Sequence, residues 1–511
     1  MSRRPHIVSS SPVRRATLAV VGATALIAAP LGAQSDAARS PDWAAFDRSV
    51  ERATRDWRVP GLAISVVSGD SLVFAKGYGV AEVGKPARAT EHTRFAIGST
   101  TKAITTAALA MLVDEGKLRW DDRVIDHLPE FRLYDPYATR ELTVRDLLTH
   151  RTGLPNTDIL WGTRENQYTI PEMMRRLRFV QPNSSFRSTW TYQNVVYSIG
   201  GLLVERISGT PWETFLRTRI FAPLGMRETE AFNADIRGKA NVAVPHDLVN
   251  DTVRVVPIRS TDAVGPAGSV WSSVSDMSRW MRFMLDSGRV GTRRLITPAT
   301  FNEIVAPQIR VSQTLYPALE LSRPHFFSYA LGWFVQDYGG ETVWMHTGSI
   351  DGQIAIVGLL PAKRVGVFVL GNLDHAELRH ALMYQVFDMY GDGPRRDWSA
   401  ELRAHLARRA AAGGGAPARV TGTRPSLALE RYVGTYSDSA FGTVQVTLAG
   451  SVLRARYDKA ELGELEHWQH DAFRSRPAPG DNAVTLIFVP DGNGGVSAVR
   501  MRGVSFARAR R

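Results

Sequence analysis

The sequence predicts an α+β protein whose first domain has one sheet built from both of its ends, followed by an all-β domain. Short β-type runs open and close the first region, and helical patterns fill its middle. Short alternating strands return after a segment rich in Ala, Gly, Arg and Pro. With 511 residues, 44% of them hydrophobic and 22% charged, the chain is long enough for two or three globular domains.

The first 33 residues predict a secretory signal peptide. Four arginines precede an apolar run over 16–31, and the small residues Gly32 and Ala33 follow it. The run is shorter than the ~20 residues that span a bilayer, so we expect cleavage and no stable membrane span in the mature protein. The protein is therefore expected in the periplasm or outside the cell. The chain has no cysteine, which excludes disulfides, thiolate metal sites and a cysteine nucleophile.

The first domain is expected over 40–395. Two apolar runs, 61–68 and 71–78, flank Gly69-Asp70 and predict a β-hairpin. Periodic apolar residues then predict a helical subdomain, with helices over 100–115, 143–148, 195–207, 212–220 and 274–285. Further strands are predicted over 333–337, 343–347, 353–360 and 365–370.

A linker is predicted over 396–424, because the stretch 408–423 lacks any apolar periodicity. A β-rich domain is expected over 425–511. Its alternating runs predict strands over 443–448, 452–457, 485–489 and 496–501, which are consistent with a small barrel.

The formal charge of +12 raises the possibility of a nucleic-acid partner. Lysine occurs at only seven positions, and no basic stretch is interleaved with aromatic residues. We therefore attribute the charge to an arginine-rich composition and predict no nucleic-acid binding. The expected partner is a small-molecule or peptide substrate, and the oligomeric state is left open.

The segment Phe95-Ala-Ile-Gly-Ser-Thr-Thr-Lys102 opens a helix that is apolar nearly all round, which predicts a buried helix. Lys102 is the only charged residue between Ser99 and Asp114. A buried ammonium is costly unless it is paired or has lost its proton. Because Ser99 and Lys102 lie on one face of the first turn, a lysine with a lowered pKa could activate the serine as a nucleophile. The alternative is a helix-capping serine beside an incidental lysine.

Two further motifs, each present once, follow in order: Tyr192-Gln193-Asn194 and His346-Thr347-Gly348. The stretch Leu142-Thr-Val-Arg-Asp-Leu-Leu-Thr-His-Arg-Thr-Gly-Leu-Pro155 and the segment Pro266-Ala-Gly-Ser-Val-Trp-Ser272 accompany them. In these motifs the chain resembles the serine hydrolases related to penicillin-binding proteins and class C β-lactamases, which include D,D-peptidases, D-aminopeptidases and family VIII esterases. The resemblance covers about 42–372 and implies a β-lactamase/transpeptidase-like fold, in which an antiparallel sheet is flanked by helices and accompanied by a helical subdomain. The C-terminal module resembles the lipocalin-like β domain of some members.

The resemblance implies that Ser99 is the nucleophile, Lys102 its activating partner, and Tyr192 both general base and leaving-group acid. It also implies an oxyanion hole formed by the backbone N–H groups of Ser99 and Ser349. The implied substrate-binding residues are Asn194, His346, Thr347 and Gly348, the glycine leaving room for the substrate backbone. The family acylates its serine and then transfers the acyl group to water or another acceptor, with no metal and no cofactor.

His346 stands where class C β-lactamases carry lysine, so a permanent charge is replaced by a group that is largely neutral at pH 7. Tyr192 should then be harder to deprotonate. This arrangement is similar to that of several D,D-carboxypeptidases and D-peptide hydrolases, so the resemblance implies hydrolysis of small peptide amides, including those with D-amino acids. A carboxylesterase on the same site is the alternative, followed by a β-lactamase and by a non-catalytic penicillin-binding or sensor protein. His150 is expected to anchor a turn, whereas Trp161, Trp271 and Trp333 could line the cleft or only pack.

Overall fold

The computed structural model describes residues 41–162, 168–413, 419–476 and 483–509. The predicted signal peptide, 1–33, lies outside the described residues. No helix within the described ranges is long and apolar enough to cross a membrane. The α+β part, 41–413, and the β part, 419–509, are described separately.

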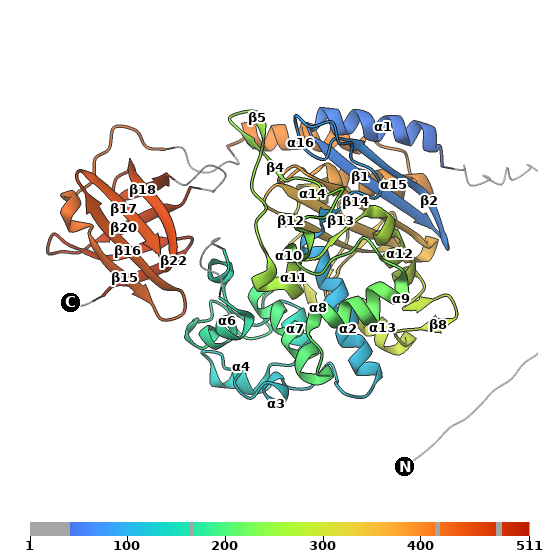
Figure 1. Cartoon of the computed structure of the whole chain (residues 1–511), viewed down its shortest axis with the longest axis horizontal. Helices are drawn as coiled ribbons and strands as arrows, with labels where there is room; N and C mark the ends of the chain where they lie inside the picture. Colours follow the sequence, from blue (N-terminus) through green and yellow to red (C-terminus); the bar gives the residue numbers. More distant parts are fainter. Residues whose placement is uncertain (1–40, 163–167, 414–418, 477–482, 510–511) are drawn as a thin grey trace, which may run out of the picture. The chain divides into compact units, whose positions relative to one another are not determined.

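The α+β part is built on an antiparallel sheet with the strand order β2-β1-β14-β13-β12-β11-β10-β9 (Figure 1). Strand β1 pairs with β14 in the register Ile64↔Val369, so the two ends of the domain meet within one sheet, as predicted. The strands are β1 (Gly61–Ser68), β2 (Ser71–Gly79), β9 (Ile309–Arg310), β10 (Phe327–Tyr329), β11 (Phe334–Tyr338), β12 (Glu341–Ile350), β13 (Gln353–Leu360) and β14 (Val365–Gly371).

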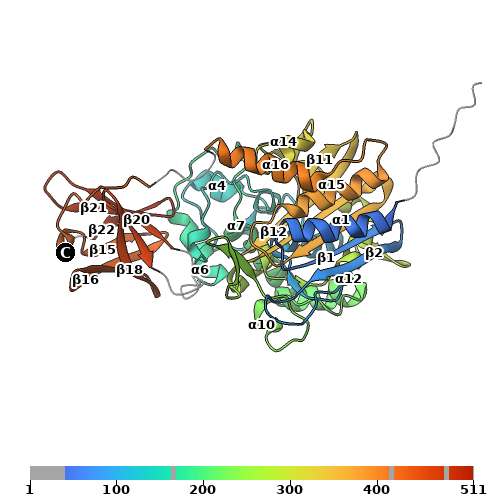
Figure 2. The ribbon, with the colours of Figure 1, turned by 90° about the horizontal axis from the view of Figure 1, so that it is seen from above.

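Helices cover both faces of this sheet, which explains why β1 is apolar on both sides. Ile64 and Val66 pack in the core shared with α1 (Trp43–Asp56), α14 (Pro317–Ser322), α15 (Leu378–Tyr390) and α16 (Trp398–Ala411). Ala63 and Val67 belong to the core on the other face, with α2 (Thr101–Asp114) and α12 (Val274–Leu285). Figure 2 shows α12 across the sheet from α1, α15 and α16.

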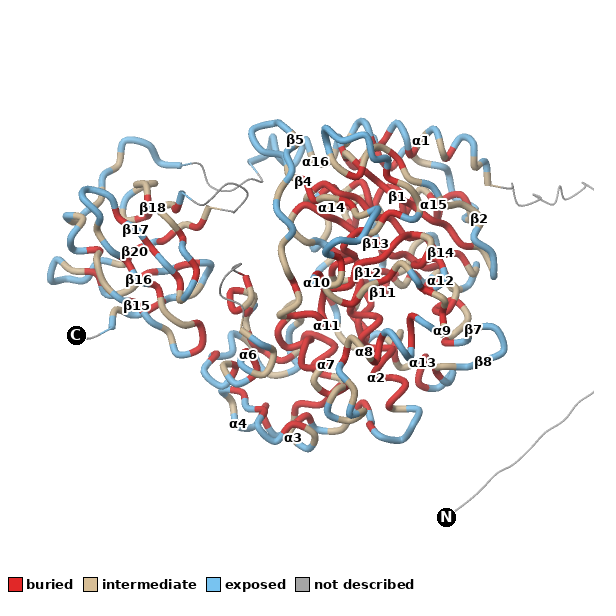
Figure 3. Tube along the Cα trace, viewed as in Figure 1, coloured by how far each residue is buried: buried red, intermediate tan, exposed pale blue. Residues whose placement is uncertain are grey.

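The middle of the chain forms the predicted helical subdomain, in which α2 is buried (Figure 3). Its helices are α3 (Val124–His127), α4 (Pro136–Glu141), α5 (Val144–Leu148), α6 (Ile170–Arg176), α7 (Asn194–Ser208), α8 (Trp212–Leu216), α9 (Ala222–Leu224), α10 (Asn233–Ile236), α11 (Gly265–Gly268) and α13 (Pro298–Val305). Short strand pairs are β3 (Phe95–Ala96) with β6 (Trp271–Ser272), β4 (His246–Val249) with β5 (Thr252–Val255), and β7 (Arg289–Val290) with β8 (Arg293–Arg294).

The helix predicted over 212–220 is α-helical only to Leu216 and continues as a π-helical turn over Arg217–Phe221. Pro223 follows this turn and has no N–H to donate to a preceding carbonyl, which accounts for the irregular hydrogen bonding.

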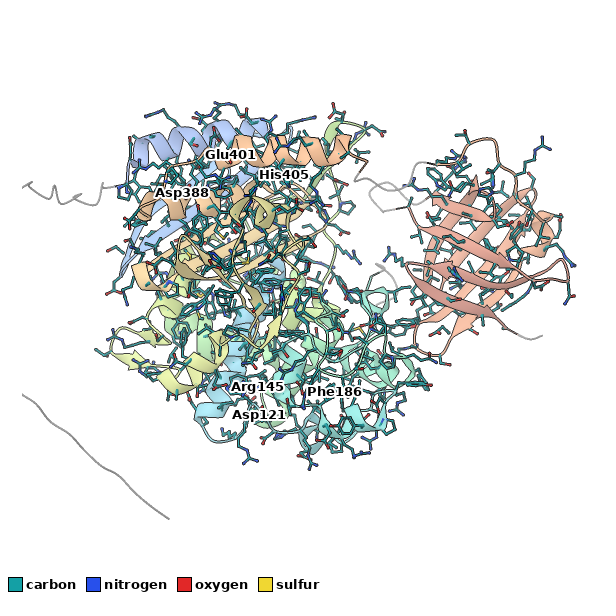
Figure 4. All side chains as sticks on the ribbon, turned by 180° about the vertical axis from the view of Figure 1, so that it is seen from behind. Asp121, Arg145, Phe186, Asp388, Glu401 and His405 are labelled. Carbon is teal, nitrogen blue, oxygen red and sulfur yellow. The ribbon has the colours of Figure 1, made fainter. Side chains whose placement is uncertain are left out.

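Helix α16 occupies part of the interval in which the sequence predicts a linker. Asp397 caps the helix by accepting from Ala400 N, and Trp398 is buried and donates from Nε1 to Asp388 at 2.8 Å. Figure 4 labels Asp388 on α15 together with Glu401 and His405 on α16. Residues 419–424 have neither helix nor strand.

The β part is a closed antiparallel barrel, which confirms the predicted all-β domain. Its interior is filled by side chains, including Tyr432, Tyr436, Phe473 and Phe488. The strands are β15 (Gly434–Asp438), β16 (Gly442–Ala449), β17 (Val452–Tyr457), β18 (Ala460–Gln469), β19 (Ala472–Arg476), β20 (Thr485–Pro490), β21 (Val496–Met501) and β22 (Val504–Arg508).

Candidate active site

Ser99 lies in a tight turn, η1 (Gly98–Thr100), that connects β3 to α2. Gly98 has φ +51°, and a Cβ at this position would lie 2.9 Å from the backbone nitrogen of Ser349. A Cβ on Gly348 would lie 2.0 Å from the Ile97 carbonyl oxygen. Two glycines therefore allow β12 to pack directly on the turn that carries Ser99. The sequence predicts that Gly348 makes room for substrate, but the atom that a side chain would meet is this carbonyl.

Lys102 is fully buried, and its Nζ lies 3.2 Å from Ser99 Oγ. Nζ also donates to Asn194 Oδ1 at 2.7 Å and to the Ala267 carbonyl oxygen at 2.8 Å. Burial lowers the pKa of Lys102 well below its ordinary value, and the charge of Asp158 only partly opposes this. A neutral amine has two N–H groups, and these donate to the oxygens of Asn194 and Ala267. Its lone pair is then left for the hydroxyl proton of Ser99.

Tyr192 lies immediately before α7 and covers the amine of Lys102, whose Nζ is 4.6 Å from the centre of the phenol ring. Its hydroxyl is in hydrogen-bonding reach of Ser99. Burial raises the pKa of Tyr192 well above its ordinary value, although the Ser99 hydrogen bond works in the other direction. The phenol therefore keeps its proton at neutral pH.

His150 supports the segment that carries Tyr192. The residue is buried with φ +57°, and its Nδ1 accepts from Gln193 N at 3.2 Å. Its ring centre is 4.5 Å from that of Tyr192. These contacts agree with the turn-anchoring role expected from the sequence.

His346 is buried on β12 and is neutral. Its Nδ1 lies 2.7 Å from the Thr347 carbonyl oxygen and so carries the hydrogen, which leaves Nε2 to accept from Tyr329 Oη at 2.9 Å. Burial and the neighbouring Lys102 lower the pKa of His346 to about 3. Thr347 Oγ1 lies 2.8 Å from Tyr316 Oη. The beginning of the third motif therefore carries no positive charge.

Arg379 of α15 holds β12 in place and was not predicted from the sequence. Its Nη1 donates to the Gly348 carbonyl oxygen at 2.6 Å and to Ser349 Oγ at 2.7 Å, and its Nη2 pairs with Glu377 at 3.1 Å. Burial raises the pKa of Glu377, but the charges of His380 and Arg379 outweigh it and lower that pKa to about 2. The guanidinium charge is thus neutralised within the protein.

Asp158 is the second unpredicted residue of the site. One of its carboxylate oxygens accepts from Asn194 Nδ2 at 2.9 Å, and the other accepts from Trp161 Nε1 at 2.9 Å. Trp161 is partly exposed, whereas Trp271 and Trp333 are buried and only pack.

The structure brings Ser99, Lys102, Tyr192 and Asn194 into one cluster, and the packing of Gly98 on Ser349 adds β12 to it. A cavity of about 400 Å³ beside Phe186 includes none of the predicted site residues (Figure 4 labels Phe186). Within the described ranges, no group of three or more His, Asp or Glu side chains is arranged to hold a metal ion.

The family model described as Beta-lactamase matches residues 46–387, which is more than half of the 511 residues. The chain belongs to the beta-lactamase family. A model described as a domain of unknown function (DUF3471) matches residues 418–510.

Proteins similar to this chain include hydrolases. The chain is 26% identical over 488 residues to unguisins hydrolase ungD of Aspergillus violaceofuscus, covering 88% of this chain and 85% of that one. The octameric penicillin-binding protein homologue from Pyrococcus abyssi matches with a TM-score of 0.60 and 21% identity, over 91% of this chain and 100% of that chain. The D-stereospecific amidohydrolase from Streptomyces sp. matches with a TM-score of 0.53 and 23% identity, over 65% and 95%. At these identities the two solved structures establish the fold alone.

Proposed function

We propose that this β-lactamase-fold hydrolase forms an acyl-enzyme on Ser99 and cleaves amides of small peptides, including those with D-amino acids. The observation that carries the proposal is the buried amine of Lys102, 3.2 Å from Ser99 Oγ. No carboxylate of the described residues forms an ion pair with this amine, and burial favours its neutral form. Amide cleavage is favoured by the similarity in fold to the D-stereospecific amidohydrolase from Streptomyces sp..

In the proposed acylation, Ser99 Oγ attacks the carbonyl carbon of the substrate while its proton passes to Lys102 Nζ. The N–H groups of Ser99 and Ser349 stabilise the oxyanion. Tyr192 gives its phenolic proton to the leaving nitrogen or oxygen, and the Lys102 ammonium returns a proton to Tyr192. Water then attacks the acyl-enzyme and restores the Ser99 hydroxyl. The resemblance implies two proton-transfer roles for Tyr192, but its raised pKa favours the role of acid alone.

A panel of three substrates tests the substrate class. The mature protein is assayed with D-alanine p-nitroanilide, p-nitrophenyl acetate and a chromogenic cephalosporin. We expect turnover of the amide and the ester and little turnover of the cephalosporin. Turnover of the ester alone would establish the carboxylesterase alternative, which needs less help from Tyr192 because ester leaving groups require less protonation. Preferential turnover of the cephalosporin would contradict the proposal.

We further propose that residues 1–33 direct export and are removed, so that the enzyme works in the periplasm or outside the cell. Intact mass and N-terminal sequencing of the exported protein would test this. An N-terminus that still includes the apolar run over 16–31 would contradict it.

A further inference from the structure

The charges around the candidate site differ between its two walls. On the β12 side, His346 is neutral and the charge of Arg379 is satisfied by Glu377. The two terminal nitrogens of Arg379, Nη1 and Nη2, donate to protein atoms of Gly348, Ser349 and Glu377, and its Nε is buried. Among the described residues, this wall offers no free cation to a substrate carboxylate.

The opposite wall carries a carboxylate. All the side-chain partners of Asp158 are neutral N–H donors, which are Asn156 Nδ2 at 3.2 Å, Trp161 Nε1 at 2.9 Å and Asn194 Nδ2 at 2.9 Å. No cation of the described residues lies within ion-pair distance of this partly exposed group. The nearby Arg259 lies over the Trp161 ring but pairs with Asp351 at 3.1 Å. Asp158 therefore has an uncompensated negative charge.

A continuous chain of contacts connects this carboxylate to the nucleophile. Asn194 uses Oδ1 to accept from Lys102 and Nδ2 to donate to Asp158, and Lys102 contacts Ser99. The acyl half of a substrate bound to Ser99 would therefore lie beside Asn194 with Asp158 at its far end. A carboxylate next to an aromatic ring is a favourable environment for an ammonium group.

We propose that Asp158, beside the ring of Trp161, binds the free α-ammonium group of the acyl residue. The preferred substrates are then amino-acid or peptide amides and esters that have a free amino terminus. Substrates that are N-acylated, or whose leaving group carries a terminal carboxylate, are disfavoured. This inference rests on the proposed acyl-enzyme at Ser99 and names the substrate class of that site.

Three benzyl esters test the inference. Esters are chosen because a serine peptidase and a carboxylesterase can both cleave them, so the test does not depend on which of the two this enzyme is. Their acyl groups are D-alanyl, N-acetyl-D-alanyl and propionyl, of which only the first carries an ammonium. We expect wild-type kcat/KM to be highest for the D-alanyl ester. The variant Asp158→Asn should lower the ratio of D-alanyl to propionyl kcat/KM by about 10- to 100-fold, the range for a charge-assisted hydrogen bond.

Asp351→Asn is the matched control, because it removes a neighbouring carboxylate that Arg259 already neutralises. It should leave the ratio of D-alanyl to propionyl kcat/KM unchanged. An equal loss for all three esters in Asp158→Asn would overturn the inference and leave Asp158 as a residue that only positions Asn194. Labelling of Ser99 by a neutral fluorophosphonate separates the two proposals. If the wild type is not labelled, the proposed function fails, whereas labelling without ammonium preference overturns only the inference.

Discussion

At the scale of single residues, burial shifts the proton affinities of Lys102 and Tyr192 in opposite directions. It lowers the pKa of the lysine and raises that of the tyrosine. Each group therefore favours its neutral form, a free amine next to an intact phenol. A base and an acid on either side of Ser99 are what acyl transfer requires. Burial of these polar groups also lowers the free energy of unfolding of the protein.

The pH dependence of acylation tests the role of Lys102. Only the neutral amine can accept the Ser99 proton, so the rate of fluorophosphonate labelling should rise with pH through a pKa below that of ordinary lysine and then level off. Lys102→Arg places a guanidinium that cannot be deprotonated, and labelling should fall by about 10²- to 10⁴-fold at all pH values. A variant that keeps the rising limb would contradict the assignment.

The role of Tyr192 is tested by comparing leaving groups. Tyr192→Phe removes the phenolic proton but keeps the ring against Lys102 and His150. We expect kcat/KM for an anilide to fall by about 10²- to 10⁴-fold and that for a nitrophenyl ester to fall much less, because nitrophenolate leaves without protonation. Equal losses for both substrates would show that Tyr192 acts mainly as a base on Ser99.

Ser99, Lys102, Tyr192 and Asn194 could be named from the sequence because each lies in a local motif, and the structure places them together. Asp158 and Arg379 could not be predicted in this way. Asp158 is identified only by its contact with Asn194, 36 residues away, and Arg379 by its contacts with a strand about 30 residues earlier. A carboxylate or guanidinium outside any motif gives no signal in the sequence, because its role depends on partners that only the fold brings into contact with it.

At the scale of secondary-structure elements, the turn after α5 determines how the active-site segment is held. Asp146 caps α5 with Thr143, and its fully buried carboxylate accepts from Arg151 at 2.5 Å and Arg187 at 2.6 Å. These arginines belong to the two loops that meet where Thr191 N donates to the His150 carbonyl oxygen at 2.9 Å. One carboxylate thus holds together the segments on which His150 and Tyr192 lie.

Neutralising this carboxylate should destabilise the protein. We expect Asp146→Asn to reduce the free energy of unfolding by about 3–5 kcal/mol, because two arginines lose a buried partner. Burial opposes ionisation of Asp146, but Arg187, Thr143 and Arg151 outweigh it and lower its pKa. Its contribution is therefore present above about pH 4 and is lost as the pH falls below that value. Urea unfolding at pH 7 and pH 3.5 measures both effects.

The matched control for this prediction is Asp121→Asn. Asp121 is 70% exposed and pairs with Arg145 at 2.8 Å, and Figure 4 shows the two side chains together. An exposed pair contributes about 0–1 kcal/mol, so the control should unfold almost like the wild type. Equal effects of the two substitutions would show that the Asp146 cluster has no special role.

Elements differed in how far sequence patterns could predict them. The helix predicted over 100–115 is confirmed as α2, Thr101–Asp114, with a left-handed Gly116 just after its end. Helix α15 was missed because it is buried on nearly all sides, packed between the sheet and α16, and its polar residues are spread around it so that it shows no amphipathic stripe. Helix α16 was missed because Ala and Arg residues, common in linkers, dominate its exposed face.

At the scale of the whole molecule, the order of strands, helices and strands predicts one sheet built from both ends of the domain, and in the structure β1 pairs with β14 although about 300 residues separate them. The alternating runs after 425 predict the barrel, because each interior position recurs with a period of two. The packing of Gly98 and Gly348 could not be predicted, because it depends on β12 crossing directly beneath the Ser99 turn. The fold thus brings the Ser99 turn and the β12 strand into one site.

The most direct test of the account is intact-protein mass spectrometry after treatment with a fluorophosphonate. We predict a single adduct on the wild type, mapped to Ser99 by peptide analysis, and none on a Ser99→Ala variant whose circular dichroism is unchanged. The control Ser349→Ala should still be labelled, because only its backbone N–H is required. Undiminished labelling of Ser99→Ala would contradict the account.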